Sequence, residues 1–158
     1  MPEITESSSN DQLAAVRAYA SAAMGCPAEV IMAVARFEDG NRHGVYRVTY
    51  RDASGAAQDV VVRISYSGDI LDLAQAEHEA AVLGRVGGVA APELYDFRRT
   101  SEGFDRPAMC LQFVPGRQQD VQTVGSAQIE QLASLLARVH ACPIDGLGES
   151  ILIGWRVS

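Results

Sequence analysis

The apolar positions of the chain follow helical spacing in three stretches and strand spacing in five. Apolar residues that recur every three or four positions predict helices over residues 11–24, 71–86 and 126–141. Strands are predicted where β-branched and aromatic residues gather or alternate with polar ones. They cover residues 30–37, 45–50, 59–64, 94–99 and 108–114, with a short helix as the alternative for 30–37. The order along the chain is therefore helix, three strands, helix, two strands, connector and helix.

The first three strands are joined by short polar loops that contain glycine. One such loop separates 30–37 from 45–50, and an Asp-Ala-Ser-Gly turn separates 45–50 from 59–64. Short loops of this kind join neighbouring antiparallel strands. The strand over 108–114 is mostly apolar, so we expect it in the interior of the sheet. The sequence predicts an α+β fold: a five-stranded antiparallel sheet with a flanking helix, preceded by an N-terminal helix and followed by a further helix.

One charge interrupts the strand predicted over 59–64. Arg63 follows three consecutive valines, and a charged side chain on a buried strand face is costly unless it is paired. The next predicted helix carries two carboxylates, Glu77 and Glu79. Glu79 is preferred as the partner because it lies along the edge of the apolar stripe of that helix, and Glu77 is the alternative. The competing interpretation is an edge strand that leaves Arg63 in water.

Composition and charge are those of a globular chain. Its 158 residues are enough for one domain with one core, and 47% of them are hydrophobic while 21% are charged. The net charge of −7 argues against general nucleic-acid binding. All 13 cationic side chains are arginines. Chemistry that needs a fixed cation must therefore use a guanidinium, which stays protonated and cannot serve as a base.

Cysteine usage and hydropathy indicate a cytoplasmic protein. The three cysteines, Cys26, Cys110 and Cys142, are odd in number and lack metal-ligand spacing. The first ten residues are polar and acidic and contain no apolar signal core. No apolar run approaches the roughly 18 residues of a membrane span. We therefore expect core thiols in a reducing compartment, no membrane association and no metal site.

Six segments with characteristic residues occur in a fixed order. They are GNRHGVYRV at 40–48, VVVR at 60–63, HEAAVL at 78–83, APEL at 91–94, MCLQFVPG at 109–116 and LLARVH at 135–140. Together they resemble the amino-terminal lobe of the aminoglycoside phosphotransferase and choline-kinase-like family. These proteins are small-molecule kinases with a protein-kinase-like fold. The resemblance thus implies a kinase-like lobe followed by a hinge and the next helix.

The first of these segments implies a phosphate-binding loop. In the family the loop of the first hairpin covers the nucleotide phosphates, and the matching residues here are Gly40, Asn41, Arg42, His43 and Gly44. Glycine lets backbone N–H groups approach phosphate oxygens closely. On their own the two glycines read as ordinary hairpin-turn glycines, so the phosphate role rests on the match.

The other segments imply a nucleotide site behind that loop. Arg63 would bind the α- and β-phosphates, and Glu79 would hold its guanidinium in position. Leu111 would lie at the back of the adenine pocket, with the backbone of Gln112 and Val114 facing the adenine edge. The cofactor implied for the intact enzyme is ATP, or GTP, with Mg²⁺. Without the resemblance, the run over 109–114 reads as a plain core strand.

The resemblance covers the amino-terminal lobe and not the catalytic half of the family. Catalysis there needs an Asp in a His-Gly-Asp-type loop and a metal-binding Asp, whereas no histidine here has an Asp two residues later. We therefore expect no catalytic residue in this chain and expect it to be inactive alone. The expected divisions are 1–25 for a tail and helix, 26–116 for the nucleotide-binding lobe, and 117–158 for the hinge connector, a first helix of the second lobe and a tail.

Three functions compete at this point. The first is the nucleotide-binding lobe of a kinase that transfers the γ-phosphoryl group of ATP to a hydroxyl of an aminoglycoside-like or choline-like acceptor. The second is a stand-alone, non-catalytic interaction module with weak or no nucleotide binding, in which a second copy or another partner covers the exposed face of the lobe. The third is an α+β domain unrelated to kinases.

Overall fold

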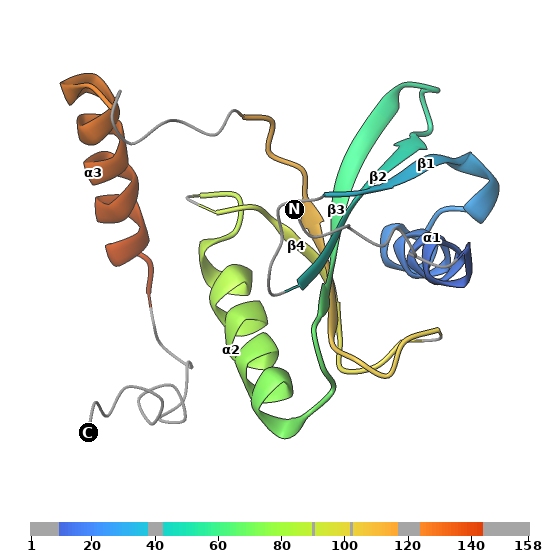
Figure 1. The fold of residues 1–158 in the computed structure, drawn as a ribbon. Helices are drawn as coiled ribbons and strands as arrows, with labels where there is room; N and C mark the ends of the chain where they lie inside the picture. Colours follow the sequence, from blue (N-terminus) through green and yellow to red (C-terminus); the bar gives the residue numbers. More distant parts are fainter. Residues whose placement is uncertain (1–9, 38–42, 90, 102, 117–123, 144–158) are drawn as a thin grey trace, which may run out of the picture.

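The computed structural model describes residues 10–37, 43–89, 91–101, 103–116 and 124–143. Within these ranges the chain forms one sheet and three α-helices (Figure 1). The helices are α1 (Asn10–Met24), α2 (Ile70–Val86) and α3 (Ser126–His140). The strands are β1 (Ile31–Arg36), β2 (His43–Arg51), β3 (Ala57–Ser65), β4 (Leu94–Arg98) and β5 (Ala108–Gln112). The predicted order of helices and strands is confirmed.

The sheet has the order β1-β2-β3-β5-β4, and every neighbouring pair is antiparallel. The predicted α+β fold with a five-stranded antiparallel sheet is therefore confirmed. β5 lies between β3 and β4, as its apolar composition predicted. β3 lies between β2 and β5, so the alternative that placed Arg63 on an edge strand is wrong.

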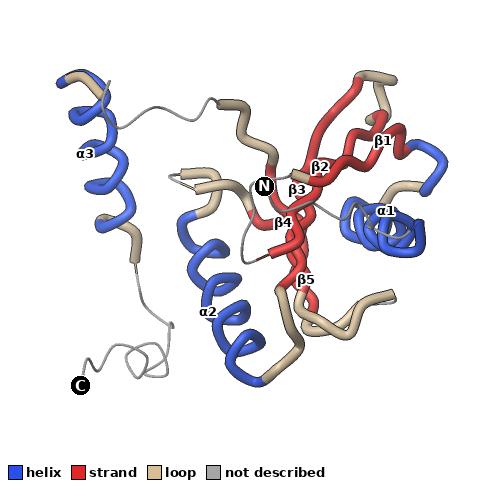
Figure 2. Tube along the Cα trace, in the orientation of Figure 1, coloured by secondary structure: helices blue, strands red, loops and turns tan. Residues whose placement is uncertain are grey.

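A helix covers each face of the sheet, with α1 on one side and α2 on the other (Figure 2). Strand residues alternate between the two faces. On β3, Val60, Val62 and Ile64 pack against the α1 side, whereas Val61 packs against the α2 side. The larger of the two cores is the one shared with α1. Its fully buried side chains include Val16, Tyr19, Tyr46, Val48 and Cys110.

β5 and β1 are shorter in the structure than the sequence suggested. β5 was expected to reach residue 114, but its last pair joins Gln112 to Val60. The residues after Gln112 leave the ladder and continue toward Pro115, which has no N–H to donate to a strand. The strand expected over 30–37 begins at Ile31, because Ala28–Val30 form a short 3₁₀ turn.

The start of α2 is fixed by a side-chain cap. The carboxylate of Asp69 accepts hydrogen bonds from the backbone N–H groups of Leu71 and Asp72, both at 2.9 Å. An N-cap of this kind satisfies otherwise unpaired N–H groups and stabilises a helix by about 1 kcal/mol. The small residues Ala76 and Ala80 are buried against the sheet, which lets the helix approach β3 and β5 closely.

The apolar stripe of helix α3 is exposed to solvent. Ile129, Leu132, Leu135 and Leu136 have exposed fractions between 37% and 58%. Arg138 of this helix donates a hydrogen bond to the carbonyl of Val89, beyond the end of α2. Among the described residues, no helix combines the length and apolar character needed to cross a bilayer.

Two buried tyrosines of the α1 core differ in whether the hydroxyl is hydrogen-bonded. Replacing each by phenylalanine should therefore affect the stability of the fold differently. The Tyr19 hydroxyl donates to the carbonyl of Ala108 at 3.1 Å, whereas the Tyr46 hydroxyl has no partner among the described residues. We expect Tyr19→Phe to lower the free energy of unfolding by about 1 kcal/mol, since a buried hydrogen bond is lost. Tyr46→Phe should be neutral or stabilising.

Urea unfolding of the three proteins in phosphate-free buffer measures this contrast. Each substitution removes one hydroxyl from a fully buried ring, so each variant is the control for the other. Equal losses in both would show that Tyr46 also has a hydrogen-bond partner in solution.

Candidate functional site

The site begins with an ion pair between the sheet and α2. Nη1 of Arg63 donates to Oε1 of Glu79 at 2.7 Å, and Nη2 donates to Oε2 of the same carboxylate. The contact expected between these two residues is therefore present, and it is bidentate. The alternative partner, Glu77, pairs instead with the exposed Arg99.

Strand alternation and helix spacing together bring the two groups into contact. Arg63 lies on the α2 face of β3, and its Nη2 also lies 3.4 Å from the sulfur of Met109. Glu79 precedes the buried Ala80 and points to the same region of the sheet. The side chains are 20% and 36% exposed. At this depth the guanidinium needs a partner, because an unpaired charge against apolar neighbours is costly.

An apolar cavity of about 430 Å³ lies at the end of β5. Its volume is in the range of small-molecule binding sites, roughly 300–1,000 Å³. Val61 lines it, two residues before Arg63 on the same strand and the same face. Two residues of a strand span roughly 7 Å, so the cavity and the ion pair lie next to each other along one face of β3. The lining residues are Phe37, Val61, Pro92, Leu111, Gln112, Phe113, Val114 and Gly116.

The three hinge residues named from the sequence all line this cavity. Leu111 is 8% exposed and Val114 is 59% exposed, so the first lies deep and the second at the surface. The backbone N–H of Gln112 donates to the carbonyl of Glu93 at 2.8 Å. This N–H is therefore already used, and a contact from Gln112 to an adenine edge is restricted to its carbonyl group.

The glycine-bounded loop is only partly described. Gly40, Asn41 and Arg42 lie outside the described residues. The backbone of His43 begins β2 and pairs with Ser65 of β3. Gly44 follows it in the ladder and pairs with Ile64. The next pair joins Val45 to Arg63, so the start of β2 lies beside the ion pair in the sheet.

Sequence reasoning missed a second ion pair, which lies at the edge of the cavity. Nη2 of Arg47 lies 2.5 Å from Oδ2 of Asp59, and the Thr49 hydroxyl donates to Oδ1 at 2.6 Å. The Arg47 guanidinium lies over the ring of Phe113, with Cζ 4.8 Å from the centroid. Arg47 is opposite Val61 in the ladder. The pair thus ties one wall of the cavity to the sheet through a cation–π contact.

The two hydrogen bonds to Asp59 have an electrostatic consequence. The Arg47 guanidinium, followed by the Thr49 hydroxyl, lowers the pKa of the Asp59 carboxyl below its ordinary value, against the opposing effect of desolvation. Asp59 is therefore a carboxylate throughout the neutral range. Among the residues that the structure describes, no group of three or more His, Cys, Asp or Glu side chains converges as a metal site.

Comparison with known proteins gave matches of two kinds, to a family model and to solved structures. A family model described as the phosphotransferase enzyme family matches residues 33–157. The crystal structure of a candidate aminoglycoside phosphotransferase from Ralstonia eutropha JMP134 is similar, with a TM-score of 0.57 and 15% sequence identity. That similarity covers 85% of this chain and 40% of the other, so this chain spans less than half the length of that protein. A search of the curated proteins found no match.

The depressed pKa of Asp59 predicts a pH-dependent effect of Asp59→Asn. The charged carboxylate stabilises the fold above the pKa of the unfolded chain, about 3.9. We expect the variant to be less stable than the wild type by a constant amount above about pH 5. The difference should shrink as the pH falls further and Asp59 takes up a proton in the folded protein.

Thermal unfolding of both proteins between pH 3 and pH 7 tests this expectation. Thr49→Val, which removes only one of the two donors, should show the same trend with a smaller amplitude. A difference that grows toward acid pH would mean that Asp59 is not the stabilised carboxylate of this pair.

Proposed function

Because this chain belongs to the phosphotransferase enzyme family, we propose that its sheet and α2 form the nucleotide-binding part of a small-molecule kinase. The reaction of such an enzyme moves the γ-phosphoryl group of ATP, or of GTP, with Mg²⁺, to a hydroxyl group. We propose an aminoglycoside-like or choline-like acceptor. The observation that carries the proposal is the Arg63–Glu79 ion pair beside an apolar cavity on one face of β3.

The cavity suits a nucleotide base. Val61 and Leu111, which are opposite each other in the β3–β5 ladder, line it from the sheet, and Phe113 and Val114 line it from the segment after β5. A planar base between such side chains buries its faces against apolar surface. We propose that its polar edge meets the carbonyl of Gln112 and the backbone of Val114, since the N–H of Gln112 is bonded to Glu93.

The ion pair suits the phosphates. A guanidinium has five N–H donors, and Glu79 takes one from each terminal nitrogen of Arg63. Nη2 also donates to the sulfur of Met109, but Nη1 keeps a second hydrogen and Nε keeps its own, so Arg63 can bind phosphate oxygens while Glu79 holds it in place. We propose that Glu79 acts as a positioning residue, and we assign no Mg²⁺ ligand to the described residues.

One observation favours a second function, that of a non-catalytic interaction module. The apolar stripe of α3, formed by Ile129, Leu132, Leu135 and Leu136, is exposed. Apolar patches of this kind mark protein contact surfaces. In that case a second copy or another protein would cover the stripe, and nucleotide binding would be weak or absent.

Thermal unfolding in the presence of Mg·ATP tests the nucleotide site. A ligand at 100 times its Kd adds about 2.7 kcal/mol to the stability of the state that binds it, which corresponds to several degrees in Tm for a chain of this size. We expect such a shift for the wild type. Arg63→Ala should abolish most of it, and Glu79→Gln should reduce it because the guanidinium loses its fixed position.

Glu77→Gln is the matched control. It removes a carboxylate from the same helix, but that carboxylate pairs with Arg99 rather than Arg63, so the shift should remain. The ligand-induced shift is compared rather than the Tm itself, because breaking a half-buried pair also lowers stability. Equal shifts in wild type and Arg63→Ala would contradict the proposed phosphate contact. No shift in wild type, together with a concentration-dependent dimer in light scattering, would favour the interaction module.

A further inference from the structure

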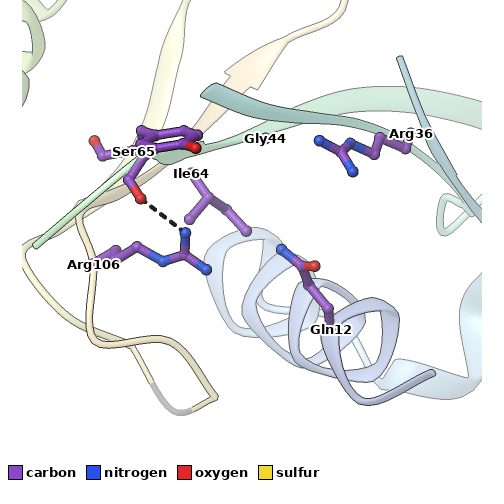
Figure 3. Close-up of a pocket in the computed structure, with 7 residues that line it drawn as sticks. Gln12, Arg36, Gly44, Ile64, Ser65 and Arg106 are labelled. Carbon is purple, nitrogen blue, oxygen red and sulfur yellow. Dashed lines mark hydrogen bonds between the residues drawn. The ribbon is translucent and has the colours of Figure 1, made fainter. Parts of the chain in front are cut away.

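A second cavity, of about 200 Å³, lies on the opposite face of the sheet from the Arg63–Glu79 pair (Figure 3). Ile64 lines it and packs in the core shared with α1, whereas its neighbour Arg63 faces α2. The cavity lies where β2 begins and β3 ends. The residues around it are Gln12, Arg36, Gly44, Ile64, Ser65, Tyr66 and Arg106.

Two guanidinium groups make this cavity positively charged. Arg36 ends β1 and Arg106 shortly precedes β5. In Figure 3 both side chains and the amide of Gln12 point toward the same space. Among the described residues, no carboxylate lines this cavity; Asp11 and Asp105, next to two of the lining residues in the sequence, are not part of its wall. The ion pairs found among the described residues use four other arginines, namely Arg47, Arg63, Arg98 and Arg99.

Two hydrogen bonds fix the position of Arg106: one from its own side chain to the residue after β3, and one between the last residue of β3 and Pro107. Its Nη1 donates to the carbonyl of Tyr66 at 3.0 Å. The following residue, Pro107, is buried, and its carbonyl accepts from the N–H of Ser65 at 2.9 Å. The guanidinium is therefore held at the cavity while most of its donors stay available. A fixed positive group that pairs with no carboxylate of the described residues is suited to an external anion.

An unpaired buried hydroxyl lies beside the same cavity. The Tyr46 side chain is fully buried, and its hydroxyl has no hydrogen-bond partner among the described residues. A Cβ atom added at Gly44 would lie 3.5 Å from that hydroxyl oxygen, and Gly44 forms part of the cavity wall. Tyr46 is also opposite Arg36 in the ladder. Buried polar groups are nearly always paired, and this one lies behind Gly44, just outside the residues that line the cavity.

We propose that this cavity binds a tetrahedral oxyanion of the phosphate class between Arg36 and Arg106, with the Gln12 amide as a further donor. Guanidinium groups match the geometry of phosphate oxygens. The volume of about 200 Å³ lies below the roughly 300 Å³ at which sites for larger ligands begin. The site therefore takes inorganic phosphate, or the phosphoryl end of a larger molecule, and not a whole nucleotide. It does not depend on the nucleotide site proposed above.

Titration of the full chain with inorganic phosphate, at constant ionic strength set with NaCl, tests this site. Binding is followed by ³¹P NMR and by Tm. We expect saturable binding to the wild type and at least a tenfold loss of affinity in Arg36→Gln and in Arg106→Gln. Arg85→Gln is the matched control, because it removes one exposed arginine from the last turn of α2; it should bind as the wild type does.

Two further variants test whether phosphate binds in this cavity rather than at the nucleotide site. Gln12→Glu places a carboxylate at the cavity, in the first turn of α1, where a negative charge favours the helix; it should fold and lose phosphate binding. Arg63→Ala should keep phosphate binding. Loss of binding in Arg63→Ala would place the phosphate at the nucleotide site and overturn the present proposal while leaving the other standing.

A second titration with glycerol 3-phosphate identifies the source of the anion. Binding of both compounds, lost in Arg36→Gln and Arg106→Gln, indicates a site for phosphoryl groups of larger molecules. Binding of inorganic phosphate alone indicates a site for the free ion. A response no larger than that to NaCl at equal ionic strength, or one that persists in both arginine variants, overturns the proposal.

Discussion

The candidate nucleotide site depends on a positive charge held inside a sheet whose two faces are both covered. β3 has neighbours on each side and a helix over each face, so only 20% of the Arg63 side chain is exposed to water. The charge is tolerated because Glu79 pairs with it through two hydrogen bonds. Taking two charges out of water is costly, and such a pair seldom adds net stability compared with apolar residues. A fixed pair that stabilises little is better explained by a function for the guanidinium.

The same alternation of strand residues divides the molecule into two chemically different sides. On β2, Arg47 faces the side of α2, and its neighbours Tyr46 and Val48 are buried under α1. On β3, Arg63 and Ile64 are consecutive, yet one belongs to the ion pair and the other lines the second cavity. β2 and β3 therefore supply residues to both sites. A ligand on either side would contact strands that also carry the other site.

Most of the fold could be predicted from the sequence, because the positions of helices and strands depend on local residue patterns. Apolar spacing located the helices and strands within a few residues, and a single charge in an apolar strand pointed to its partner on the next helix. The sequence could not choose between Glu77 and Glu79 with certainty, because the choice depends on the rotation of α2 over the sheet. Ala76 and Ala80 set that rotation by packing against Met109 and Leu111, which are distant in sequence.

The features that sequence reasoning missed all depend on contacts between distant segments. The place of Phe113 against Arg47 follows from where β5 leaves the ladder, and that point is set by its pairing with Val60. The alternation of polar and apolar residues predicted only that Arg47 is a polar residue on a strand. In the structure it forms an ion pair with Asp59 and also stacks on an aromatic ring. Lysine, whose ammonium lacks a planar face, would not stack on the ring in the same way. The wall of the apolar cavity at the end of β5 thus depends on a residue type that local pattern does not distinguish.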